Sequence, residues 1–215
     1  MPDVAEKLRE FFAKYPERVF AKGQIVVHGG EEPAGIFYMI EGRVSQYDIA
    51  TNGNEVVVNV FKPPAFFPTS WAINKTPNQY FFKASTRVVA KLAPPEEVVA
   101  FLRREPEVLF DLLARVYRGT DGLLRRMAHM MGGDARSRLL FEVITATYRF
   151  GKKDADDVWR TPLNEGELAL QSGLARETVN RVIHGLKAEG LVIISSAELI
   201  VPDIIRLQDE LGADL

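Results

Sequence analysis

The chain has 215 residues, of which 47% are hydrophobic and 26% charged, so it has room for one large or two modest globular domains. It contains no cysteine, which excludes disulfides, thiol redox switches and cysteine-ligated iron–sulfur clusters. No apolar run approaches a membrane span and the N-terminus has no signal segment, so we expect a cytoplasmic protein without a membrane partner. The formal net charge of −2 gives no overall attraction to nucleic acid, so any DNA-binding surface must be local.

The first hundred residues predict a short helix followed by a β-rich domain. Val4, Leu8, Phe11 and Phe12 recur at helical spacing near the N-terminus. Short β-rich runs follow, separated by turn residues, over 24–28, 35–40, 43–49, 55–61, 79–84 and 87–92. Asn52-Gly53 is the best hairpin signal of the chain. Regularly spaced short strands of this kind predict an antiparallel sandwich or barrel.

A long helix is predicted to begin at Pro106 and to run to residue 131. Its apolar residues alternate spacings of four and three, which is an a/d heptad seam. The residues of this seam are Leu109, Leu113, Val116, Thr120, Leu123, Met127 and Met130. We expect the seam to form a parallel homodimer, although a helix packed on its own barrel would produce part of the same stripe.

Polar residues of the long helix add two expectations. Asp111 with Arg115, and Asp121 with Arg125, are four residues apart and are predicted to pair on the exposed flanks. Thr120 is a polar interruption of the seam, which can fix its register or touch a ligand.

The long helix is predicted to end at Gly132-Gly133, and Asp134 is well placed to cap the next helix. We expect the glycine pair to be a hinge. The charged run at 152–157 is interpreted as a solvated loop without chemistry.

Residues 167–181 predict two short helices joined by a turn that contains Gly173. The apolar residues of the second helix, Val179, Val182, Ile183 and Leu186, repeat at helical spacing and should face a core. A strand over 190–194, a turn at 195–197 and a strand over 198–201 follow and predict a small hairpin. Together these elements predict a winged helix-turn-helix.

The polar face of the second helix is the candidate DNA-binding surface. In the major groove, arginine can donate two hydrogen bonds to guanine and glutamate can accept one from cytosine. The predicted contacts are Arg176, Glu177, Thr178, Asn180, Arg181, His184 and Lys187. Arg136, Arg138 and Arg160 are expected to add to this basic footprint. A solvated amphipathic helix is the plain alternative for the helix taken alone.

The order of barrel, long helix, glycine pair and winged helix resembles the Crp/Fnr family of bacterial transcription regulators. The most specific parts are 176–181 (Arg-Glu-Thr-Val-Asn-Arg), which looks like the recognition-helix signature of that family, and the glycine-bounded strands from Lys22 to Val44. The resemblance implies an α+β fold with an antiparallel jelly-roll barrel over 1–105, a dimerisation helix over 106–131 and a winged domain over 132–215. It also implies base contacts from Arg176, Glu177 and Arg181, and a cap from Asp134. Ala175 departs from the pattern, because relatives usually carry a capping serine there.

The resemblance also implies where a signal would bind. Family members that bind cyclic AMP place Gly-Glu and Arg-Ser or Arg-Thr pairs around its phosphate and ribose. This chain has Pro68-Thr69 and Gln79-Tyr80 at those places, so the phosphate-binding arginine and the ribose carboxylate are missing. We therefore expect no cyclic AMP binding.

Two alternatives remain for the equivalent pocket. A small neutral ligand could bind among Phe66, Phe67, Thr69, Ser70, Trp71, Asn74, Gln79 and Tyr80, or the aromatic residues could fill the barrel. A signal bound between barrel and seam, near Thr120 and Trp71, would bias the dimer. Haem is possible in principle, but a structural role is expected for His28 and His129, and a place on the DNA face for His184.

Competing functions are weaker. A cupin-type metalloenzyme would need converging histidines, which this chain cannot supply, and no catalytic motif is present, so we predict no catalytic or metal site. A ligand-sensing or scaffolding module whose winged helix contacts protein is the alternative, but such an interface would favour aromatic anchors. The predicted function is a homodimeric, sequence-specific DNA-binding regulator on a palindromic site, with double-stranded DNA and RNA polymerase as partners.

Overall fold

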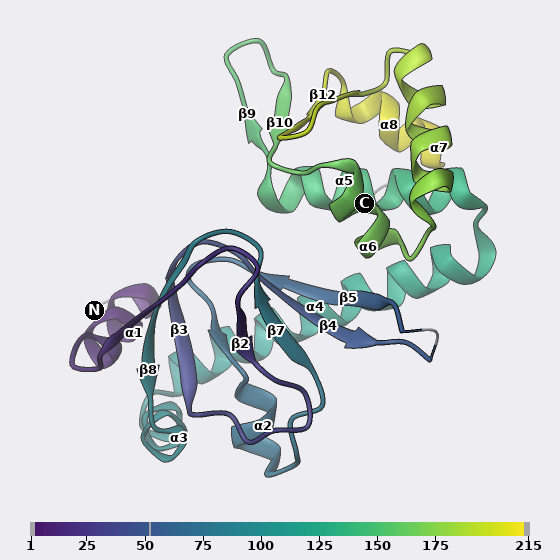
Figure 1. Ribbon diagram of the computed structural model, residues 1–215. Helices are drawn as coiled ribbons and strands as arrows, with labels where there is room; N and C mark the ends of the chain where they lie inside the picture. Colours follow the sequence, from purple (N-terminus) through teal and green to yellow (C-terminus); the bar gives the residue numbers. More distant parts are fainter. Residues whose placement is uncertain (1–2, 52, 213–215) are drawn as a thin grey trace. The chain divides into compact units, whose positions relative to one another are not determined.

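The computed structural model describes residues 3–51 and 53–212, and it divides into two compact units that meet in the chain between Thr120 and Asp121 (Figure 1). The two units are described separately. In the described ranges, no helix is long and apolar enough to cross a membrane.

The first unit is an antiparallel β-fold with helices at both ends. Its elements are α1 (Val4–Ala13), β1 (Glu17–Phe20), β2 (Ile25–Val27), β3 (Ile36–Glu41), β4 (Val44–Ile49), β5 (Glu55–Phe61), β6 (Phe66–Phe67), α2 (Thr69–Asn74), β7 (Phe81–Ala84), β8 (Val88–Ala93), α3 (Pro95–Arg104) and the start of α4 (Pro106–Gly132). The strands form two four-stranded sheets in the orders β1-β8-β3-β6 and β2-β7-β4-β5. This arrangement confirms the predicted jelly-roll class, while β1, β6 and α2 are additions to the predicted elements.

The β4–β5 hairpin forms where the sequence predicts it, with a shift in register between Gln46 and Tyr47. Val44 pairs with Phe61 and Ile49 with Glu55, and the Ala50 amide donates to the Asn54 carbonyl at 2.9 Å. Gly53 adopts a φ of +81°, which suits a glycine in a tight turn, and Asn52 lies outside the described residues.

The interior of the sheets is filled by aromatic rings. Phe67 stacks on Phe82 with ring centroids 4.9 Å apart and also contacts Phe61 and Phe37. Because successive strand residues point to opposite faces, the neighbouring Phe66 belongs to a second cluster, with Phe12 beneath the helices.

The eight candidate pocket residues lie in different surroundings. Phe66 and Phe67 lie in different clusters, and Trp71 packs with the cluster of Phe66. Thr69 is half-buried, whereas the remaining four are exposed: Ser70, Asn74, Gln79 and Tyr80. For Phe66 and Phe67 this packing agrees with the second alternative of the sequence analysis, in which the aromatic residues fill the interior.

Helix α4 leaves a wide apolar face in solvent. Val108 is buried and Leu112 packs against the core of the first unit. The other large apolar side chains of this helix are exposed and make up the apolar face: Leu109, Phe110, Leu113, Val116, Tyr117, Leu123, Leu124, Met127, Met130 and Met131. This set contains every apolar residue of the predicted seam.

Of the two ion pairs predicted on the flanks of α4, only one forms in the described part of the chain. Arg115 Nε lies 2.7 Å from Asp111 Oδ2, and its guanidinium also donates to the Pro64 carbonyl at 2.5 Å. Asp121 and Arg125 form no ion pair among the described residues, because their exposed side chains are free to extend into solvent. Thr120 Oγ1 donates to the Val116 carbonyl at 3.0 Å, so this polar interruption is satisfied within its own helix.

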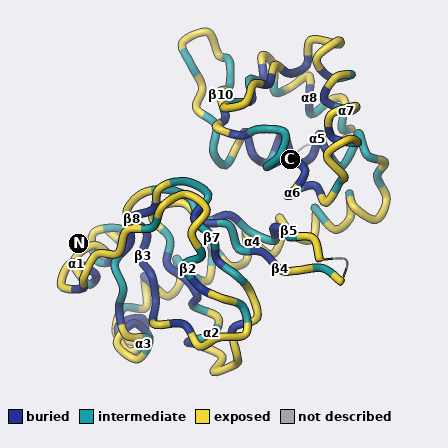
Figure 2. The backbone as a smooth tube through the Cα atoms, in the orientation of Figure 1, coloured by how far each residue is buried: buried dark blue, intermediate teal, exposed yellow. Residues whose placement is uncertain are grey.

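The second unit is a winged helix-turn-helix. It contains α5 (Ala135–Phe150), β9 (Lys152–Lys153), β10 (Trp159–Thr161), α6 (Glu165–Ser172), α7 (Arg176–Ala188), β11 (Ile193–Ile194), β12 (Leu199–Val201) and α8 (Ile204–Leu211). Four strands form a sheet in the order β11-β12-β10-β9. Its core includes residues of α5, α6, α7 and α8, and Figure 2 marks the buried stretches of the chain in dark blue.

The charged run at 152–157 is not a plain solvated loop. It forms the hairpin from β9 to β10, and Asp154 Oδ1 accepts the amides of Asp156 and Val158 at 3.0 Å. Arg160 Nε lies 3.1 Å from Asp154 Oδ2 across the hairpin. The other residues of this run are exposed, as the sequence interpretation expects, but the role of Asp154 was missed because an aspartate that caps a turn looks the same in sequence as one that is only hydrated.

The corner between α4 and α5 is braced, so the predicted hinge at Gly132-Gly133 is also corrected. The Gly133 amide donates to the His129 carbonyl at 2.9 Å, and a Cβ on Gly133 would lie 2.6 Å from that oxygen. Arg126 bonds both carboxylate oxygens of Glu142 at 2.6 and 2.7 Å. These contacts lie wholly inside the second unit and fix the last turns of α4 on α5.

Candidate nucleic-acid interface

Local sequence explains why α6 and α7 form a helix-turn-helix. Asn164 and Glu167 make a reciprocal capping box at the start of α6. Gly173 ends that helix with a φ of +66°, a conformation that glycine adopts without strain. Ala175 then precedes α7 without a side-chain cap, as the sequence predicts.

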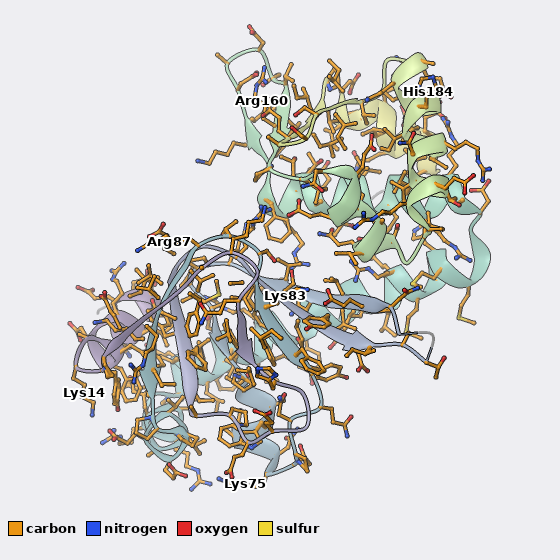
Figure 3. All side chains as sticks on the ribbon, in the orientation of Figure 1. Lys14, Lys75, Lys83, Arg87, Arg160 and His184 are labelled. Carbon is orange, nitrogen blue, oxygen red and sulfur yellow. The ribbon has the colours of Figure 1, made fainter. Side chains whose placement is uncertain are left out.

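Packing decides which face of α7 is available. Val179, Ile183 and Leu186 are buried in the core of the second unit, and Val182 packs against it. On the other side a shallow depression of about 500 Å³ is lined by Arg176, Glu177, Asn180, Arg181 and His184. Figure 3 labels His184 on this helix. The structure thus brings together five of the seven predicted DNA contacts.

The remaining two predicted contacts lie beside this depression. Lys187 is exposed one turn further along α7, and Thr178 is half-buried toward the core. Thr178 is therefore less available to a partner than its neighbours in the sequence.

Charge pairing separates two kinds of basic residue in the second unit. Arg176, Arg181 and Lys187 form no ion pair with any described carboxylate. By contrast, Arg136 contacts Glu189 at 2.6 Å and Glu210 at 3.0 Å. The hydrogen bond to Glu189 is the main reason that the pKa of Arg136 is raised further above its usual range. Helix α7 therefore carries three cations without an ion pair among the described residues.

The three other arginines that were expected to add to the basic surface each have a partner within the second unit. Arg160, labelled in Figure 3 on β10, lies 3.1 Å from Asp154 and 3.4 Å from Glu198. Arg138 donates to the Gly133 carbonyl at 3.2 Å. Carboxylates also outnumber basic side chains over residues 132–215. Arg136 and Arg160 are therefore already paired with carboxylates of their own unit.

The hairpin after α7 has a short polar tip. Ser195 Oγ accepts the amides of Ala197 and Glu198 at 3.2 and 3.1 Å, which closes the turn between β11 and β12. Ile193 pairs with Ile200, and Ile194 with Leu199. The tip presents small hydroxyl side chains and backbone groups, which can approach a phosphate closely.

One contact of the exposed polar face of α7 could not be predicted from the sequence. Glu165, the first residue of α6, accepts a hydrogen bond from Asn180 Nδ2 on α7 at 3.4 Å. The two residues are 15 positions apart, and no periodicity within a single helix relates them. Only the angle between the two packed helices brings them together.

The three histidines lie on separate elements. His129 on α4 contacts the Phe141 ring at 4.6 Å, and His28 contacts the Phe81 ring at 6.1 Å. His184 is exposed on α7. Among the described residues, no group of three or more histidine, aspartate or glutamate side chains could hold a metal ion.

Two family models match the chain in the order that the fold suggests. Residues 17–105 match a cyclic nucleotide-binding domain, and residues 137–210 match a Crp-like helix-turn-helix domain. The chain belongs to the Crp/Fnr family. This Crp/Fnr protein is a transcriptional regulator with a DNA-binding helix-turn-helix, as the sequence analysis predicted.

Individual relatives extend the match to most of the chain. The Crp/Fnr protein is 23% identical over 192 residues to a CRP-like cAMP-activated global transcriptional regulator of Mycobacterium tuberculosis, with 87% of this chain and 84% of the relative covered. It is 23% identical over 201 residues to the transcriptional regulator LdrP of Thermus thermophilus, with 91% and 97% covered. A solved CRP/FNR-family regulator from the same organism superposes with a TM-score of 0.74 at 21% identity, covering 92% of this chain and 99% of that one.

Proposed function

We propose that this regulator binds a palindromic DNA site as a homodimer, with α7 of each copy in the major groove of one half-site. The observation that carries this proposal is the face of α7, where exposed Arg176 and Arg181 have no ion pair among the described residues and flank Glu177. Arginine reads guanine and glutamate reads cytosine in the major groove. A chromosomal target would place its action in the cytoplasm.

The exposed face of α4 supports the dimer. Four of its side chains, Phe110, Tyr117, Leu124 and Met131, are spaced by seven residues and lie next to the predicted seam. An apolar stripe of this width is typical of a helix that packs against another helix. A second copy would cover it, and a two-fold dimer would set the two α7 helices about 34 Å apart, one turn of DNA.

Cyclic AMP does not gate the protein in this proposal. Pro68 lacks a backbone N–H donor, and Gln79 and Tyr80 bring no cation to the place of the phosphate. The nearby buried amide of Asn78 is already used, because its Nδ2 donates to the carbonyls of His28 and Tyr80. These residues do not fit a cyclic nucleotide anion. We also propose that the protein works without haem or another resident cofactor, and that it acts on transcription through RNA polymerase.

Selection of bound DNA from a random pool tests the proposal directly. A palindromic consensus with half-sites about 10 base pairs apart is expected, together with a dimer in sedimentation. Arg176→Ala and Arg181→Ala should each weaken specific binding by about 1–3 kcal/mol and relax one base pair per half-site. Lys187→Ala is the matched control, because a phosphate contact weakens all sequences alike.

Two results would contradict this function. Equal loss of specific and nonspecific binding in both arginine variants would remove those residues from base reading. A monomer that binds one half-site at full strength would exclude the dimer. Calorimetry with cyclic AMP is expected to show no binding, and DNA affinity should be the same with and without the nucleotide.

A further inference from the structure

The amide of Asn180 is held by a residue outside the recognition helix. Asn180 Nδ2 lies 3.4 Å from Glu165 Oε2, and Asn180 also lines the depression on α7 with Arg176 and His184 on its two sides. Glu165 is half-buried and forms no ion pair with a described cation. Its position in the first turn of α6 suits a carboxylate, because helix N-termini stabilise negative charge. The acceptor is therefore in place before any DNA arrives.

A carboxylate next to an asparagine fixes which end of the amide faces it. An ionised carboxylate only accepts hydrogen bonds, whereas an asparagine amide has a donor NH₂ and an acceptor oxygen. The NH₂ group of Asn180 must therefore face Glu165, and its Oδ1 must face the other way. Without Glu165, the amide could present either end to a base edge.

We propose that Glu165 is a positioning residue that makes Asn180 an acceptor in the major groove, and so selects a base with an exocyclic amino group. Adenine presents its N6 amino group and cytosine its N4 amino group in that groove, whereas guanine and thymine present the acceptors O6 and O4. Oδ1 of Asn180 can accept a hydrogen bond from the amino group of adenine or cytosine, but it meets another acceptor on guanine or thymine. One position of each half-site should then be adenine or cytosine.

This inference rests on the proposed function, and it makes a separate claim about Glu165. A carboxylate near the DNA face could instead act only through its charge, by repelling phosphates. That effect would change the affinity for all sequences alike, because phosphates carry no sequence information. The hydrogen bond would change one base preference and leave the others as they were.

Two substitutions at the same position separate these effects. Glu165→Asp keeps the charge but draws the acceptor back by one methylene, out of reach of Asn180. Glu165→Ala removes both the charge and the acceptor. Selection from a random DNA pool, followed by affinity measurements on sites that differ only at the Asn180 position, should compare both variants with the parent and with Asn180→Ala.

The parent is expected to prefer adenine or cytosine at this position roughly 3- to 10-fold over guanine or thymine, the range of one hydrogen bond. Both Glu165 variants should reduce that preference to about 1, while the bases read by Arg176 and Arg181 stay selected. In an Asn180→Ala background, Glu165→Ala should change the preference no further.

Retention of the amino-base preference in either Glu165 variant would overturn the proposal. Continued selection at the two arginine positions shows that each variant is folded and binding. If the parent protein itself selected no sequence, the proposed function would fail, which is a different outcome from failure at this one position.

Discussion

The buried ion pair of Arg126 and Glu142 should contribute strongly to the stability of the second unit. The side chain of Glu142 is 3% exposed and that of Arg126 is 15% exposed, and two hydrogen bonds join them. Burial raises the pKa of Glu142, while the charge of Arg126 opposes that shift. Removal of either partner would leave a charge in the interior without its counter-charge.

The perturbation is a double-mutant cycle with Arg126→Met and Glu142→Met. Each single variant should lose about 3–5 kcal/mol of unfolding free energy, the usual loss when one partner of a buried pair is removed. With an m value of about 2 kcal/mol per molar urea, the midpoint should fall by roughly 1.5–2.5 M. The double variant should be more stable than either single one, although Arg149 nearby then loses the attraction of Glu142.

The chain is suited to a fluorescence assay because it has two tryptophans, Trp71 in the first unit and Trp159 packed against the core of the second. In a Trp71→Phe background, tryptophan fluorescence during urea unfolding reports on the second unit alone. The reasoning would be refuted if each single variant lost less than about 1 kcal/mol, or if the two losses added within about 0.5 kcal/mol.

Three further predictions concern helix ends in the second unit, each measured by the same urea titration. Gly133→Ala should destabilise the unit by about 1–3 kcal/mol, since its Cβ would lie 2.6 Å from a carbonyl oxygen. The Cβ of Gly132→Ala meets open space, so this control should stabilise the unit by about 0.5–1 kcal/mol. Equal effects of the two substitutions would contradict the braced corner. Ala175→Ser should stabilise α7 by about 1 kcal/mol if it supplies the missing cap, and an unchanged midpoint would show that packing already fixes this end. Asp134→Ala should lower the urea midpoint at neutral pH, because the hydrogen bond from the Ser137 amide lowers the pKa of Asp134 in the folded state. That stabilisation is present above the unfolded pKa of about 4 and is lost as the pH falls through the folded pKa. The midpoints of parent and variant should therefore converge in acid.

The sequence predicted the elements whose patterns are long and local. The spacing of Val179, Ile183 and Leu186 is enough to orient α7, because a helix buries one stripe wherever its neighbours lie. The cap of Asp134 was found for the same reason, since its partner is three residues away.

Elements and contacts without a local signal were missed. Strand β6 has only two residues, Phe66 and Phe67, and no alternation can be read from two aromatic residues whose side chains enter different clusters. The contact of Glu165 with Asn180 depends on the angle between two helices, which no residue pattern specifies. Conformation at Gly132-Gly133 was misjudged because glycine permits flexibility without requiring it.

The acidic balance of the winged unit has a consequence for how such a protein would search a chromosome. Nonspecific affinity grows with the number of phosphates that cations neutralise. Acidic residues outnumber basic ones over residues 132–215, and three of the cations without an ion pair among the described residues lie on α7. Most genomic sequence would then hold the protein only briefly, so few copies would be sequestered away from their operators. Target occupancy at low copy number would depend more on specific base contacts than on nonspecific affinity for DNA.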